Sequence, residues 1–149
     1  MKSRSRIETH APHAQAISFA KVPDGQRLTI LAVDSDLGFL CWLGCALSHA
    51  GHVTLPAVNC RDAFDLLSRV RSGIDLLVVN YSIQGASALA MALSRSQRHL
   101  KVIALVGYGD EPCLAPGRVD AFYCRCSHVD EASETEWLET IEGVLACGS

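Results

Sequence analysis

The sequence predicts a single α/β domain in which a parallel β-sheet carries helices on both faces. Five short apolar runs alternate along the chain with segments of helical periodicity, and such alternation favours a parallel sheet covered by helices. The length of 149 residues suits one domain. Hydrophobic residues make up 49% of the chain and charged residues 19%, which supplies enough apolar surface for one core and excludes a disordered chain.

The first 26 residues lack hydrophobic periodicity and are predicted to form a flexible tail, so the ordered domain is expected over 27–147. The tail holds no continuous apolar run of the kind that an export signal needs. Elsewhere no apolar stretch approaches the roughly 18–20 residues that cross a bilayer. A cytoplasmic protein without membrane contact is therefore the expectation.

The first strand is predicted over 28–33 (LTILAV), where apolar and β-branched residues follow one another without interruption, as in a strand buried on both faces. A helix is predicted over about 37–50, because its apolar residues recur at helical spacing. The second strand, over 53–58, contains Pro56. Because proline cannot donate a ladder hydrogen bond, it indicates a strand at the edge of the sheet.

The middle of the chain continues the alternation. Asn59 is a candidate N-cap for a helix over about 61–71. The run 74–79 (IDLLVV) is the strongest strand of the sequence and is predicted to lie in the centre of the sheet. A further helix is predicted over about 86–97 and a fourth strand over 101–106 (KVIALV).

The last third is less regular. Residues 107–118 hold three glycines and two prolines, so any helix there must be short or broken. A fifth strand is predicted over 119–124 (VDAFYC) and a last helix over about 133–146. Ser133 is a candidate N-cap for that helix, and Glu136 three residues later would complete a capping box.

Charge and cysteine content exclude two classes of protein. A formal net charge of −3 provides no overall basic field, so nucleic acid is not an expected partner. Seven cysteines form an odd set, which argues against a disulfide framework and favours buried thiols that pack as small apolar groups. They are Cys41, Cys45, Cys60, Cys113, Cys124, Cys126 and Cys147.

Two cysteine pairs could suggest a metal site, although packing is the favoured interpretation of both. Cys124 and Cys126 have no matching second pair in the sequence, and tetrahedral zinc needs four ligands. Cys41 and Cys45 lie one helical turn apart, and so do Cys45 and His49, but leucines surround them. Neither a metal site nor a cofactor is therefore predicted.

The candidate site lies at the carboxyl ends of the strands, where doubly wound sheets form their sites. The residues at these ends are Asp34, Ser35, Asp36, Asn80, Val106 and Arg125. The stretches around them, ILAVDSD, IDLLVVNYSIQG, VIALVGYGD and VDAFYCRC, resemble the motifs of the receiver domain of bacterial response regulators. The resemblance covers about 28–146 and implies a flavodoxin-like, doubly wound five-stranded parallel sheet with the strand order 2-1-3-4-5.

The sequence departs from the receiver pattern at most positions that carry the family's chemistry. In the family an aspartate at the position of Asn80 accepts a phosphoryl group, while acidic neighbours hold Mg²⁺. The Asn80 amide has no negative charge for nucleophilic attack or for Mg²⁺ ligation. Ser35 replaces the second acid of the first-strand pair, Val106 replaces a hydroxyl residue, and Arg125 replaces a lysine. The resemblance therefore implies a pseudo-receiver without a phosphoryl acceptor.

Such a module is expected to act through protein–protein interaction in phosphorelay signal transduction. The implied partner is a signalling protein, such as a histidine kinase, another regulator or an effector, and a homodimer is an alternative. The alternative function is a small-molecule or redox sensor that uses the degenerate phosphorylation pocket at the strand ends, or the cysteines. An enzyme is not expected, because the sequence contains no pair of nucleophile and base, no glycine-rich phosphate-binding loop and no metal-binding motif.

Three side chains carry further predictions. Asp34 and Arg125 are predicted to form a structural ion pair across the degenerate phosphorylation pocket, and a site for an anion or a partner is the alternative for this pair. Phe122 lies at the position where the family often has an aromatic residue that takes part in the activation switch. A plain core role is favoured for Phe122, because Val106 offers it no hydroxyl partner.

Overall fold

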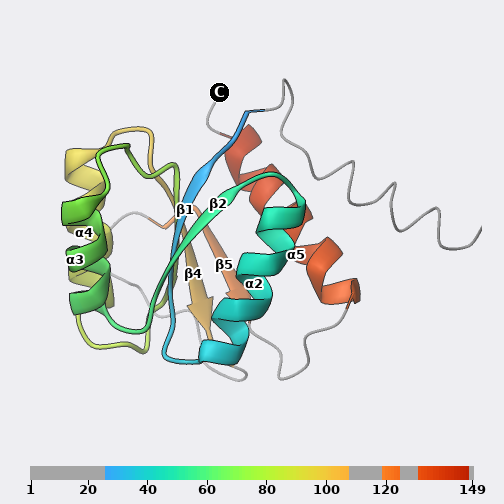
Figure 1. Cartoon of the computed structure of the whole chain (residues 1–149), viewed down its shortest axis with the longest axis horizontal. Coiled ribbons are helices and arrows are strands. Elements are labelled where there is room, and N and C mark those ends of the chain that lie inside the picture. Colours follow the sequence, from blue (N-terminus) through green and yellow to red (C-terminus); the bar gives the residue numbers. More distant parts are fainter. Residues whose placement is uncertain (1–25, 108–118, 125–130, 148–149) are drawn as a thin grey trace, which may run out of the picture.

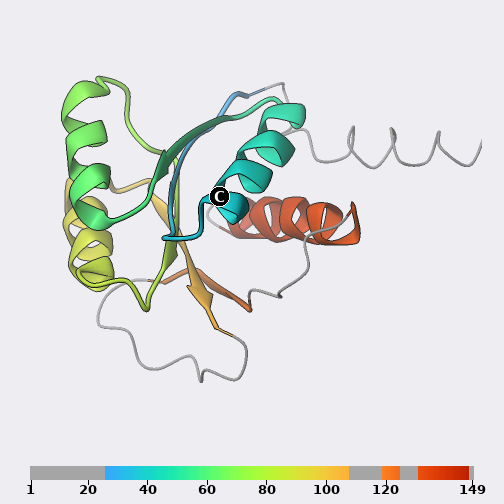
Figure 2. The same cartoon turned by 60° about the horizontal axis from the view of Figure 1, so that its bottom comes forward.

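The computed structural model describes residues 26–107, 119–124 and 131–147. They form a five-stranded sheet with the strand order β2-β1-β3-β4-β5, and every pair of neighbouring strands is parallel. One layer of helices, α3 and α4, covers one face of the sheet, and α2 and α5 cover the other (Figure 1). The predicted fold class and strand order are therefore confirmed, and Figure 2 shows the three layers from a second direction.

The strands are β1 (Thr29–Val33), β2 (Val53–Ala57), β3 (Leu76–Asn80), β4 (Lys101–Val106) and β5 (Ala121–Cys124). The helices are α2 (Leu37–His49), α3 (Cys60–Arg69), α4 (Ala86–Ser96) and α5 (Glu131–Ala146). Each element lies within two residues of its predicted bounds. The predicted tail lies outside the described residues except for its last residue, as does most of the glycine- and proline-rich segment 107–118.

Single residues in the sequence predicted one edge strand and one helix start correctly, and one helix start incorrectly. Pro56 lies in β2, which is an edge strand as predicted. Asn59 caps α3, because its Oδ1 accepts a hydrogen bond from the backbone N–H of Asp62 at 2.7 Å. The predicted cap at Ser133 is wrong, since α5 begins at Glu131 and Ser133 lies in its first turn. A capping sequence is a local preference, and a helix that packs on the sheet can extend past it.

The alternation of side chains across the sheet divides the core into two halves. Ile30 and Ala32 of β1 face α2 and α5, whereas Leu31 and Val33 face α3 and α4. The residues 76–79 of β3 divide in the same way. All of these side chains are buried, which explains why the strands read as continuous apolar runs.

An aromatic cluster joins α5 to the sheet and to α2. The Trp137 side chain is 2% exposed, and its ring centroid lies 4.1 Å from that of Tyr123 on β5 and 5.9 Å from that of Phe39 on α2. The Trp42 ring stacks on the outer side of Phe39 at 6.0 Å. Trp137 is therefore the largest of the four α5 side chains in this core, with Leu138, Ile141 and Val144.

Three side chains pin the amino edge of the sheet, the edge at which the parallel strands begin. His52, Asp75 and Asp120 each directly precede a strand, and each accepts a hydrogen bond from a backbone N–H on the neighbouring strand or just before it. Asp75 Oδ2 accepts from Thr29 N at 2.8 Å, and Asp120 Oδ2 accepts from Val102 N at 2.8 Å. These bonds satisfy backbone donors that the ladder leaves open where it starts.

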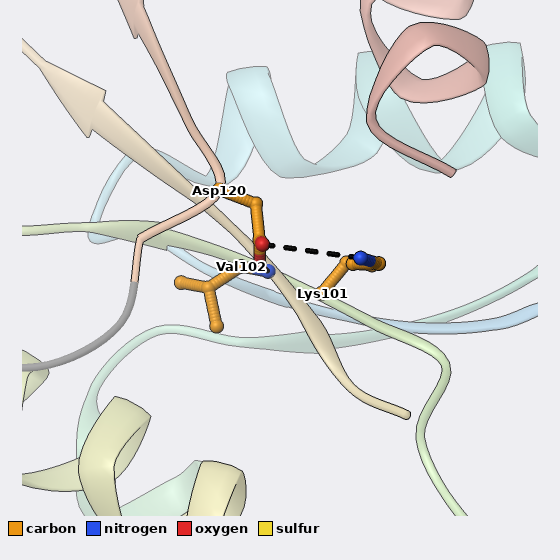
Figure 3. Close-up of polar contacts among 3 residues, drawn as sticks. All are labelled: Lys101, Val102 and Asp120. Atoms are coloured by element: carbon orange, nitrogen blue, oxygen red, sulfur yellow. Dashed lines mark hydrogen bonds and ion pairs between the residues drawn. The ribbon is translucent and has the colours of Figure 1, made fainter. Parts of the chain in front are cut away.

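Figure 3 shows the contact that Asp120 makes at this edge, between β5 and its neighbour β4. The Asp120 carboxylate lies between the backbone of Val102 and the side chain of Lys101, whose Nζ is 4.0 Å from Asp120 Oδ1. Both side chains of the ion pair are mostly shielded from solvent. One carboxylate thus ties the start of β5 to β4 by a hydrogen bond and an ion pair.

His52 is predicted to make stability depend on pH. It is 5% exposed, its Nδ1 accepts from Leu28 N at 3.3 Å, and burial lowers its pKa below the ordinary value of 6.5, while the charge of Asp75 acts in the opposite direction. The unfolded chain therefore takes up the proton first, so this contribution is present above about pH 6.5 and is lost as the pH falls toward the folded pKa. We expect the urea midpoint to fall between about pH 7.5 and pH 5.5.

The variant His52→Gln, which keeps an acceptor but does not titrate, should lose part of this pH dependence. The exposed His99→Gln variant should keep it. Equal slopes of the urea midpoint against pH in the wild type and in His52→Gln would contradict the assignment.

Candidate functional site

The carboxyl ends of β1 and β3 bring two of the predicted site residues into contact. Asp34 directly follows β1, and Asn80 is the last residue of β3, which pairs with β1. Asn80 Nδ2 donates a long hydrogen bond of 3.4 Å to Asp34 Oδ2. The prediction that residues from separate strands would meet at this edge is therefore confirmed for this pair.

Asp34 is held in place by both of its carboxylate oxygens. Its side chain is 1% exposed, so the carboxylate requires hydrogen bonds to compensate for its lost hydration. Oδ1 accepts from the backbone N–H of Asp36 at 2.9 Å, while Oδ2 accepts from Asn80. The Asp34 backbone N–H donates to Ala57 O on β2 at 3.1 Å. The carboxylate therefore connects the start of α2 to the central strand.

The Asn80 side chain uses both ends of its amide. Oδ1 accepts from the backbone N–H of Ser82 at 2.9 Å and from Ser82 Oγ at 2.7 Å, while Nδ2 points to Asp34. Asp34 can only accept and the Ser82 N–H can only donate, so one orientation of the amide makes all three bonds. An ionised carboxylate at this position could keep the bonds to Ser82 but could not donate to Asp34.

Ser82 is a site residue that the sequence analysis missed. The sequence feature that could have identified it is the serine two residues after Asn80. An asparagine side chain that accepts from the backbone N–H two residues later forms an Asx turn. The pattern is local and common. Its meaning depends on the other end of the amide, which contacts a residue 46 positions away along the chain.

Asp36 and Ser35 follow Asp34 at the start of α2. Asp36 is the N-cap of α2, and its Oδ1 accepts from Phe39 N at 3.1 Å. Both Asp36 and Ser35 are exposed. The acid that the sequence leaves beside Asp34 is therefore occupied in starting a helix.

Val106 ends β4 and is half-buried. Its aliphatic side chain provides no hydrogen bond at the place where the family has a hydroxyl. Arg125 lies outside the described residues, and so does the predicted ion pair between Asp34 and Arg125.

The prediction of a core role for Phe122 is wrong, since its side chain is 45% exposed. Phe122 lies on β5, an edge strand, where successive side chains point to opposite faces. Its neighbour Tyr123 takes the inward position against Trp137. Phe122 consequently points to the other face, and about half of its surface remains in solvent.

The prediction of buried thiols is correct for Cys60 and wrong for Cys41, Cys45 and Cys147, which are exposed. Burial raises the pKa of the Cys60 thiol. Cys41 and Cys45 lie on the outer side of α2, because Leu40, Leu43 and Leu47 of that helix take the inward positions. In the part of the chain that the structure describes, no three His, Cys, Asp or Glu side chains are placed to hold one metal ion.

Comparison with known proteins gives matches only at the level of structure. No protein-family model matches the sequence, and no curated protein matches it. A response regulator from Thermotoga maritima has a TM-score of 0.67 at 19% identity, over 81% of this chain and 99% of its own. A chemotaxis response regulator of Vibrio cholerae has a TM-score of 0.63 at 14% identity, over 80% of this chain and 100% of its own.

A second Thermotoga maritima protein, the response regulator TrrA in complex with Mg²⁺ and beryllofluoride, has a TM-score of 0.62 at 20% identity, over 79% of this chain and 99% of its own. These likenesses show that the chain has the fold of a response-regulator receiver domain. Within residues 26–107, 119–124 and 131–147, no helix combines the length and the apolar character needed to cross a bilayer.

Proposed function

We propose that this chain is a receiver-like module of two-component signalling that accepts no phosphoryl group and acts through contacts with a signalling protein. The observation that carries the proposal is the amide of Asn80, which donates to Asp34 and accepts from Ser82. The receiver fold supports the signalling context, and the hydrogen bonds of this amide support the loss of the reaction.

The chemistry of the pocket argues against phosphorylation at Asn80. An amide oxygen carries no net charge, and this one already accepts two hydrogen bonds from Ser82. Attack on phosphorus needs an activated, electron-rich nucleophile, which this group is not. The position therefore keeps the shape of a receiver pocket without its reactive atom.

The same contacts argue against a tightly bound Mg²⁺. A hard dication binds through several oxygen ligands, with carboxylates supplying the charge. Both oxygens of Asp34 accept hydrogen bonds, and Asp36 caps α2 with its carboxylate. In this arrangement the Asn80 amide donates a hydrogen bond to Asp34, where an ordinary receiver holds a cation.

A module of this kind would have one resting conformation at the pocket. Phosphorylation in receivers acts by adding charge that reorders neighbouring loops. Here the loop after β1 and the loop after β3 are already joined through Asp34, Asn80 and Ser82. The proposed partner, a histidine kinase, another regulator or an effector, should therefore bind with the same affinity whether or not a phosphoryl donor is present.

The direct test is the intact mass of the protein after incubation with MgCl₂ and acetyl phosphate, with an ordinary receiver treated in parallel. We expect no change in mass, while the control protein gains one phosphoryl group. A stoichiometric phosphoryl gain on this chain would refute the proposal, and mapping it to Asp34 or Asp36 would identify the acceptor.

A further inference from the structure

The described basic residues gather at one edge of the molecule. Of the seven lysines and arginines that the structure describes, only Arg61 lies at the carboxyl edge, where α3 begins. The others lie at the amino edge, because helices in this fold run back antiparallel to the strands and end beside the next strand's start. Five of them, which we name the amino-edge cluster, are exposed: Arg27, Arg69, Arg71, Arg95 and Arg98.

Neighbouring carboxylates do not neutralise the amino-edge cluster. Asp75 and Asp120, the acids that directly precede strands at this edge, both accept hydrogen bonds from backbone N–H groups. Asp120 forms its ion pair with Lys101, which is not part of the cluster. Over the described residues, none of the five arginines lies within ion-pair distance of a carboxylate.

Helix stability explains only part of the cluster. Arg69 and Arg95 lie in the last turns of α3 and α4, where a positive charge interacts favourably with the helix dipole. Arg27, Arg71 and Arg98 lie outside the helices, so this interaction does not account for them.

Two arginines of the cluster, Arg27 and Arg98, line a hollow of about 760 Å³ at the amino edge. Arg27, Arg98 and His99 supply cationic or titratable groups to its wall, and hydroxyl and amide groups supply hydrogen-bonding atoms. The uncharged polar residues of the wall are Thr29, Ser72, Ser96 and Gln97, and Asp75 adds one carboxylate. Gln97 is fixed in place, since its Oε1 accepts from Ile74 N at 2.7 Å. The hollow is thus a polar recess bordered by positive charge.

We propose that the amino-edge cluster and this hollow bind an acidic peptide segment of a partner protein. The inference rests on the proposed function as an interaction module and names the chemistry of its partner. An extended segment with several carboxylates can contact arginines that are spread over three separate parts of the chain. A compact inorganic anion in the hollow would lie near only Arg27 and Arg98 and beside the Asp75 carboxylate, whereas an extended segment can also reach the arginines outside the hollow.

Two other occupants are disfavoured by charge. A symmetric dimer through this edge would bring the same positive patch against itself. The exposed Glu136, Glu139 and Glu142 on α5 could meet the cluster of a second copy only in a head-to-tail contact, and such contacts build rings or filaments in place of a symmetric dimer. Nucleic acid is a long polyanion, and a chain whose net charge is −3 has no overall positive field to attract it.

The test is the binding of a fluorescein-labelled peptide of about 12 glutamates, followed by fluorescence anisotropy at low and high NaCl without Mg²⁺ or a phosphoryl donor. We expect saturable binding at low salt that weakens as salt increases. The triple variant Arg27→Gln, Arg71→Gln, Arg98→Gln should bind about tenfold more weakly. All the substituted side chains are exposed, so circular dichroism should show an unchanged melting temperature.

The chain offers a matched control at the two ends of α3. Arg71→Gln and Arg61→Gln each remove one exposed arginine, but only Arg71 belongs to the cluster. Binding should weaken in Arg71→Gln and stay within about twofold of the wild type in Arg61→Gln. Equal losses in the two variants would mean binding to diffuse charge and would overturn the proposal.

Other outcomes would replace the proposed occupant. Preferential, cluster-dependent binding of a single-stranded DNA of equal length would indicate nucleic acid, and displacement of the peptide by low concentrations of pyrophosphate would indicate a small anion. Salt-sensitive self-association in sedimentation, abolished by the triple variant, would indicate a second copy. The mass measurement with acetyl phosphate is independent of all these results, so the failure of one proposal can be distinguished from the failure of the other.

Discussion

Replacement of Trp137 by alanine is expected to lower the free energy of unfolding by about 3–5 kcal/mol, the range typical of a buried large aromatic side chain truncated to alanine. Trp137 is 2% exposed and contacts Tyr123 of β5 and Phe39 of α2 through its ring. The substitution would leave a cavity where α5, α2 and the sheet meet. Urea denaturation followed by circular dichroism measures the loss.

The chain's other tryptophan is the matched control. Trp42 is half-buried and touches the same Phe39 from the outer side of the cluster, at a centroid distance of 6.0 Å. Trp42→Ala removes the same atoms from a partly solvated place and should cost less than about 2 kcal/mol. Equal costs for the two variants would show that α5 does not anchor the core through Trp137.

Replacement of Asn80 by aspartate is expected to destabilise the Mg²⁺-free protein by about 1–3 kcal/mol at neutral pH. The amide that donates to Asp34 would become a second carboxylate facing a carboxylate that is 1% exposed. Like charges in a buried site raise the pKa of one of them, so the loss should diminish as the pH falls and one carboxyl group becomes protonated. Mg²⁺ should restore part of the stability, because it would bind the folded variant between the two carboxylates.

Asn59→Asp is a close control for this change. Asn59 Nδ2 donates to Asp62 Oδ2 at 3.4 Å, the distance found between Asn80 and Asp34, but on the exposed surface. Aspartate is also a good N-cap, so this variant should stay within about 0.5 kcal/mol of the wild type and should not respond to Mg²⁺. An Asn80→Asp protein as stable as the wild type without Mg²⁺ would contradict the role assigned to the amide.

Asn80→Asp alone is not expected to create a working receiver. Ser35 still occupies the place of an acid, and Val106 that of a hydroxyl residue. A phosphoryl group would therefore meet a weaker metal site and one fewer hydrogen-bond donor than in an ordinary receiver. The mass measurement with acetyl phosphate separates the recovery of a cation site from the recovery of the reaction.

The sequence by itself determined the architecture, because the signals for it are short-range and repeated. Continuous apolar runs are required of strands that are buried on both faces, and all five runs form strands. Pro56 indicated an edge strand through its missing N–H, and Asn59 indicated a helix start through its side-chain oxygen. The strand order was implied by the resemblance of the strand-end motifs, and the structure has that order.

The sequence also identified Asp34 and Asn80 as site residues, because the topology brings the carboxyl ends of neighbouring strands together. It did not identify Ser82, since the serine acquires its role only once the amide orientation is set by Asp34 on another strand. It named Asp36 as a site residue, and the structure adds that its carboxylate caps α2.

Only the tertiary structure decided which side chains meet solvent and which charges meet each other. Periodicity indicates that a residue lies on one face of a strand or helix, but not what covers that face. For this reason Phe122 was expected in the core, and the outward positions of Cys41 and Cys45 were not foreseen. The five arginines of the amino-edge cluster are scattered between residues 27 and 98, and their common edge arises because each helix returns antiparallel to the strands. Contacts between distant residues depend on packing in three dimensions, which no local pattern of sequence encodes.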